Sequence, residues 1–213
     1  MKIKPIANSW NDMPLGVWQK EQAILREKDT DAVDKNVRLV SLMYGISEVD
    51  AYNTELNKFS DMLDGIGWLS SQPSVPNVAP AYNLNGNPYI VTLNPQKITT
   101  AQYIDYKSFD PDDPATIHLI LSTVMIPSGH TYNDGYDMEK VQQDILEYLR
   151  VPHALAIVRF FFQYYKRLTL NSLHSLTQLL KKEARKTKDR EKKNQIMIQI
   201  KRTEELERTF GSL

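Results

Sequence analysis

The residues of this 213-residue chain that could do chemistry are four histidines, two aspartate-rich turns and a run of lysines and arginines. The histidines are His118, His130, His153 and His174. None stands three or four residues from another, whereas a zinc site needs three or four converging ligands. Cysteine is absent, which removes disulfides and thiolate chemistry. We therefore expect no metal site and no cofactor.

The aspartate-rich segments 110–113 and 133–137 could hold a cation. The first lacks the spacing and closing glutamate of a calcium-binding helix–loop–helix, and Pro111 within it and Pro114 directly after it stiffen the loop. The second has the composition of a turn followed by a helix cap at Asp137. Sequence signatures of nucleotide-binding loops, serine hydrolases and zinc proteases are also absent, so the sequence favours a protein that is not an enzyme.

The basic run Lys181–Lys193 has eight positive and three negative residues. The run has three interpretations. It forms a solvated helix face, it binds an acidic protein surface such as the N-terminal region of a neighbouring copy, or it binds the phosphates of a nucleic acid. It lacks the interleaved aromatic residues that stack on bases. Its expected partner-binding residues are Lys181, Lys182, Arg185, Lys186, Arg190 and Lys193.

Charge is segregated along the chain, although the net charge is zero. Residues 1–150 carry 12 Lys/Arg and 20 Asp/Glu, while residues 151–213 carry 14 and 6. The two parts therefore have net charges of −8 and +8, so the chain can pair head to tail with a copy of itself or with charged partners.

Two further segments are expected to contact partners. Trp10 lies in a polar segment before the first helix and is a candidate external anchor. Asn85-Gly86 predicts a tight hairpin turn, after which Tyr89, Val91 and Leu93 alternate on one strand face. Because a lone hairpin is unstable in water, we expect this strand to pack on a helix or to extend a partner's sheet from its edge.

The elements that position these residues are mainly helices. An acidic N-terminal helical bundle is expected over residues 1–71, with helices at 14–27 and 31–44 and another capped by Thr54. Leu25 and Val33 are expected on its buried side. Residues 72–81 form a proline-rich linker.

Residues 82–150 are expected to form the hairpin and several short helices, with 117–126 assigned to a helix. Residues 151–213 form a long helical region that includes the basic run, with a break near Thr169–Asn171. No stretch approaches the ~18 apolar residues of a membrane span, and the N-terminus lacks a signal-length apolar run. The fold class is thus mainly α, and the expected location is the cytoplasm.

Four stretches of the middle of the chain have a familiar sequence: Tyr82–Gly86, Leu93-Asn94, Lys97–Asp105 and Ile126–Asp137. Together they resemble structural-region proteins of tailed bacteriophages of Bacteroidetes, including crAss-like phages. Leu39–Ser47 and Gly67–Leu69 are similar in style to the tail-assembly chaperones of such phages. The resemblance covers about residues 14–165 of the chain.

This resemblance implies a non-catalytic morphogenesis protein that binds other phage structural proteins. It would be a virion component of the neck or tail, packaged cargo, or a tail-assembly chaperone absent from the mature virion. Its location would be the virion or the host cytoplasm, and it would form a homo-oligomer or a hetero-complex. A nucleic-acid-binding protein that uses the basic run is the alternative from another class.

Overall fold

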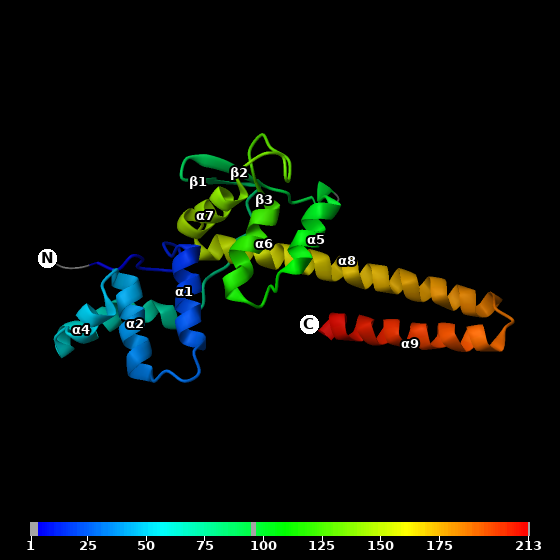
Figure 1. The fold of residues 1–213 in the computed structure, drawn as a ribbon, viewed down its shortest axis with the longest axis horizontal. Coiled ribbons are helices and arrows are strands. Elements are labelled where there is room, and N and C mark those ends of the chain that lie inside the picture. Colours follow the sequence, from blue (N-terminus) through cyan, green and yellow to red (C-terminus); the bar gives the residue numbers. More distant parts are fainter. Residues whose placement is uncertain (1–3, 95–96, 213) are drawn as a thin grey trace. The chain divides into compact units, whose positions relative to one another are not determined.

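The computed structural model describes residues 4–94 and 97–212. It confirms a mainly α fold with a small antiparallel sheet and two long C-terminal helices, α8 (Val151–Lys186) and α9 (Arg190–Ser212) (Figure 1). The chain divides into two compact units, residues 1–159 and 160–213. The division falls inside α8, so the boundaries expected at residues 71, 81 and 150 all lie within the first unit.

The first unit contains seven α-helices before α8 among the described residues, together with two 3-10 turns and three strands. The helices are α1 (Leu15–Arg26), α2 (Ala32–Tyr44), α3 (Glu48–Tyr52), α4 (Leu56–Gly65), α5 (Thr100–Ser108), α6 (Ile117–Val124) and α7 (Met138–Tyr148). The 3-10 turns are η1 (Gly67–Ser70) and η3 (Pro114–Thr116), and the strands are β1 (Ala81–Leu84), β2 (Asn87–Val91) and β3 (Met125–Pro127).

Several helix ends are determined by local sequence. The Asp31 carboxylate accepts hydrogen bonds from two backbone N–H groups at the start of α2, and Gly45 ends that helix with a φ of 63°. Thr99 and Gln102 form a reciprocal capping box on α5. The prediction that Thr54 caps α4 was wrong, because Glu55 is the residue that precedes the first turn of α4, and its side chain makes no capping hydrogen bond.

The sheet has the order β1-β2-β3, with both pairs antiparallel. Asn85 and Gly86 have φ values of 50° and 79°, which confirms the tight turn. The helix expected over 117–126 ends at Val124, because Met125 and Ile126 pair with β2. The third strand therefore comes from this chain itself. Of the two arrangements expected for this strand, packing on a helix agrees with the hydrogen bond from Tyr89 to Asp144 of α7, whereas an edge open to a partner's sheet does not agree with the central position of β2.

The N-terminal segment is tied to the junction of α7 and α8 by the backbone. The Leu15 N–H donates to the Leu149 carbonyl at 2.9 Å, and the Val151 N–H donates to the Met13 carbonyl at 3.0 Å. These bonds explain why the first turns of α8 belong to the first unit. Leu25 and Val33, which were expected to be buried, are instead 45% and 63% exposed.

Candidate protein-interaction surface

The second unit is an antiparallel helical hairpin made by α8 and α9 (Figure 1). The expected break at Thr169–Asn171 was wrong, because α8 is continuous. The side chains buried between the two helices recur every three or four residues, which is the spacing of a coiled-coil seam. They are Thr177 and Ala184 on α8 and Ile196, Ile200 and Thr203 on α9, with Leu180 packed against them.

Three polar contacts define how the helices face each other. Thr177 donates to Glu207 at 2.8 Å, the Lys181 ammonium lies 2.8 Å from Glu204, and Lys192 lies 3.6 Å from Glu183. The hydrogen bond from Lys181 lowers the pKa of Glu204. These contacts are exposed or half-buried, so they define the register of the hairpin more than they stabilise it.

Exposed leucines gather on one side of this hairpin. On α8, Leu176 lies eight residues after Leu168 and three before Leu179, so all three project from the same side. Their exposed fractions are 38%, 46% and 64% for Leu168, Leu176 and Leu179.

Leu206 of α9, which is 48% exposed, belongs to the same side. Glu183 stands seven residues after Leu176, and Leu206 stands fourteen after Lys192. Residues separated by seven or fourteen positions lie on the same side of a helix, so Leu176 lies on the side of Glu183 and Leu206 on the side of Lys192. Because Glu183 and Lys192 pair across the hairpin, Leu176 and Leu206 share one side of it. A hollow of about 480 Å³ adjoins Leu206. We call Leu168, Leu176, Leu179 and Leu206 the leucine face.

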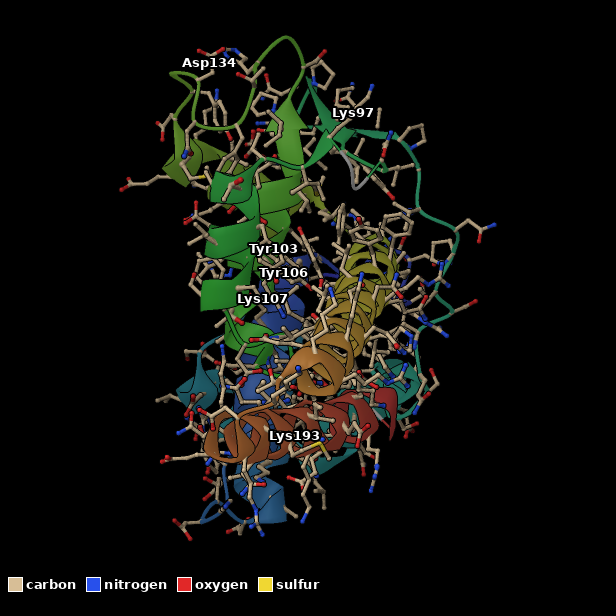
Figure 2. The ribbon with its side chains drawn as sticks, turned by 90° about the vertical axis from the view of Figure 1, so that its right-hand side faces the viewer. Lys97, Tyr103, Tyr106, Lys107, Asp134 and Lys193 are labelled. Atoms are coloured by element: carbon tan, nitrogen blue, oxygen red, sulfur yellow. The ribbon has the colours of Figure 1, made fainter. Side chains whose placement is uncertain are left out.

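The basic residues expected to bind a partner gather around the closed end of the hairpin, but not on one side. Lys181 is partly buried by its ion pair with Glu204, while Lys182, Arg185, Lys186, Arg190 and Lys193 are exposed. Figure 2 labels Lys193 on α9. Lys182 and Lys186 stand three and seven residues after Leu179, so they flank the leucine face, as does Arg202 four residues before Leu206.

Trp10 makes contacts within the first unit. Its indole N–H lies 3.1 Å from both the carbonyl and the hydroxyl of Ser71. Its ring meets that of Trp68 edge to face, with 5.1 Å between centroids. Trp10 thus joins the N-terminal segment to the end of η1, and its role as an external anchor stays a prediction.

The expected strand residues mostly support the interior of the first unit. The Tyr89 hydroxyl donates to Asp144 of α7 at 2.6 Å, and Tyr89 and Val91 are 2% and 3% exposed. Burial raises the pKa of Tyr89, and the hydrogen bond to the Asp144 carboxylate raises it further. Leu93 is half-buried and lies beyond the end of β2. Because β2 has a neighbour on each side, it cannot pair with a partner strand without displacing one of them.

The polar residues considered for chemistry serve turns, caps and local contacts. Asp110 and Asp113 accept backbone N–H groups within their own turn, and Asp137 caps α7. Asp134 lies in the loop between β3 and α7, where Figure 2 labels it. Burial lowers the pKa of His118, whose ring faces the Gln19 amide at 3.2 Å. Within residues 4–94 and 97–212, no group of three or more metal-ligating side chains converges.

A groove of about 670 Å³ lies between α1 and α7. Its lining is mostly apolar and includes Gly16, Ala23, Ala115 and Leu146, with Lys20 and Glu147 among its polar residues. Its polar lining residues are Gln19, Lys20, Gln143 and Glu147, and the Gln143 amide donates to the Glu147 carboxylate at 3.0 Å.

Four further exposed apolar residues, which the sequence pattern did not indicate, lie on the neighbouring helices α2, α3 and α4. Val33, Val49, Tyr52 and Leu56 are 63%, 67%, 56% and 80% exposed. Val49 and Tyr52 share one side of α3, and the Tyr52 hydroxyl donates to Asp34 beside Val33. We call these four residues the acidic apolar patch. In the sequence, aspartate or glutamate stands beside or near these apolar residues, and this pattern could have indicated the patch.

Comparisons with protein-family models, with curated proteins and with solved structures find no match to this chain. Among the residues that the structure describes, no helix has the length and apolar character needed to cross a membrane. The function is therefore inferred from the surfaces of this molecule and from its sequence.

Proposed function

We propose that this protein is a non-catalytic morphogenesis protein of a tailed bacteriophage that works through protein–protein contacts of its helical hairpin. The leucine face is the observation that carries this proposal. Single exposed leucines are common on soluble proteins, but several on one side of a two-helix hairpin favour a contact surface.

The thin seam of the hairpin supports the same proposal. Among the side chains that the structure describes there, the buried apolar cluster consists of Ala184, Ile196 and Ile200, with the partly buried Leu180 packed against it. The four leucines are 38–64% exposed, so complete burial of each would contribute about half of the ~1.5–3 kcal/mol that a fully exposed leucine contributes. A partner helix laid on the leucine face would therefore add to the small apolar burial of the seam.

The bacteriophage assignment is supported by the sequence stretches that resemble phage structural-region proteins. The protein would be a virion component of the neck or tail region, or packaged cargo. A tail-assembly chaperone absent from the mature virion is the alternative within the same class.

Quantitative mass spectrometry of gradient-purified particles and of lysate from infected cells tests this proposal, once the gene is located in a phage genome. Abundance in particles supports a virion component, and abundance only in lysate supports the chaperone. A gene outside any phage genome would contradict both alternatives.

Nucleic-acid binding is a second candidate, favoured by the exposed basic side chains around the closed end of the hairpin. DNA affinity that falls steeply with salt, and that collapses when Lys182, Arg185 and Lys186 are changed to Glu, would support it. No binding at low salt would exclude this candidate.

A further inference from the structure

The two units of the chain carry opposite charge. Residues 1–159 contain 13 Lys/Arg and 20 Asp/Glu, a net charge of −7, whereas residues 160–213 contain 13 and 6, a net charge of +7. Two hairpins brought together would repel each other, while a hairpin brought to an acidic surface would be attracted. Charge therefore disfavours a dimer made by hairpin against hairpin.

The leucine face combines apolar side chains with positive charge at its margins. Lys182, Lys186 and Arg202 flank it, and all three are exposed. Its occupant should therefore present apolar side chains surrounded by carboxylates.

The acidic apolar patch has this chemistry. Residues 29–64, which contain it, carry eight Asp/Glu and three Lys/Arg. The Lys35 ammonium donates to the Leu25 carbonyl at 3.2 Å, and Lys58 pairs with Glu55 at 3.1 Å.

Arg38 is held within the first unit by contacts with Glu27 and Glu48. The three basic side chains of residues 29–64 are thus engaged locally, which leaves a net excess of carboxylates around the patch.

We propose that the leucine face of one copy docks on the acidic apolar patch of a second copy. This inference rests on the proposed function, because it names the partner of the hairpin. The two surfaces differ, so the contact is head to tail, and repetition of it builds a closed ring or an open chain of copies. Such repetition suits a protein that takes part in building a larger particle.

Sedimentation velocity of the full chain over a range of concentrations tests this contact. The hairpin variant carries Leu176→Ser with Leu179→Ser, and the patch variant carries Val49→Ser with Leu56→Ser. Leu179, Val49 and Leu56 are 64–80% exposed and Leu176 is 46% exposed, so we expect both variants to keep the fold, which circular dichroism checks. The matched control is Ile104→Ser on α5, whose side chain is 60% exposed outside both surfaces.

We expect the wild-type chain and the control to associate as concentration rises, and less so in high salt. Each double variant alone should associate at least about tenfold more weakly, as expected when central apolar anchors are lost. A mixture of the two variants should form a discrete 1:1 dimer, because each supplies the surface that the other lacks.

Several results would overturn the inference. They are a wild-type chain that stays monomeric at high concentration, a double variant that associates like the wild type, or a mixture that stays monomeric. The wild-type chain could be monomeric while substitutions in the leucine face still prevent its incorporation into particles. That result would contradict docking between copies and would leave the proposed function supported.

Discussion

Replacing Ile200 with alanine should open the α8–α9 hairpin without unfolding the rest of the chain. Ile200 is 5% exposed and is one of three side chains in the buried apolar cluster of the second unit. Truncating a buried isoleucine to alanine costs about 2–5 kcal/mol. Because isolated helices are marginal in water, a loss of this size approaches the whole stability of a two-helix hairpin.

Hydrogen–deuterium exchange followed by mass spectrometry measures this effect segment by segment. With about 1.4 kcal/mol per tenfold, the opening equilibrium for α9 amides should rise at least about thirtyfold in Ile200→Ala. Exchange in α1, α6 and α7 should stay unchanged, because these helices belong to the first unit. The matched control is Met197→Ala, whose side chain on α9 is 52% exposed and whose loss should change little.

One contrary result is that α9 in Ile200→Ala keeps exchange rates within about twofold of the wild type, under conditions where exchange reports the opening equilibrium. Another is that Met197→Ala opens the hairpin as much as Ile200→Ala does. Either result would show that the seam residues do not hold these helices together.

Three further predictions concern the first unit, and urea unfolding measures each of them. Tyr89→Phe removes a hydrogen bond to the buried carboxylate of Asp144 and should lower the free energy of unfolding by about 1–3 kcal/mol. Burial raises the pKa of Glu21 above its usual value near 4.5, so the free energy of unfolding should fall as pH rises through the pKa that Glu21 has in the folded protein. Glu21→Gln should remove this pH dependence and should be more stable than the wild type at neutral pH. Gly16→Ala places a Cβ 3.1 Å from the carbonyl oxygen of Leu146 and should cost about 1–3 kcal/mol.

Controls and contrary results distinguish these predictions from general destabilisation. Gly67→Ala meets nothing within 4 Å and should leave the free energy of unfolding nearly unchanged. A Glu21→Gln protein with the same pH profile as the wild type would show that Glu21 does not titrate abnormally. Equal stability of Tyr89→Phe and the wild type would mean that the Asn87 amide, 3.3 Å from the same Asp144 oxygen, satisfies this carboxylate together with water as well as the tyrosine does.

Local features of the fold were predictable because their causes lie within a few residues. The cap at Asp31, the helix stop at Gly45 and the turn at Asn85-Gly86 depend on backbone N–H groups and φ values close by in the chain. The capping box that begins at Thr99 is another case.

The failed predictions involve contacts between distant segments. Periodicity placed Val33 on a buried side, but no element covers it in the described structure, where it is 63% exposed. Met125 and Ile126 continue an apolar run that suits a helix, yet they pair with β2, which lies some 35 residues earlier. The polar segment Thr169–Asn171 suggested a break, but the intact backbone ladder carries the helix through it.

For the candidate surfaces, the sequence by itself determined the charge separation and the set of basic residues near the closed end of the hairpin, because charge depends only on residue type. Only the tertiary structure decided which apolar side chains stay exposed, since exposure depends on what packs against each helix. The leucine face depends on the register set by the Glu183–Lys192 pair, and the acidic apolar patch depends on how α3 lies against α2. Both are relations between residues on separate helices, which the order of residues along the chain does not specify.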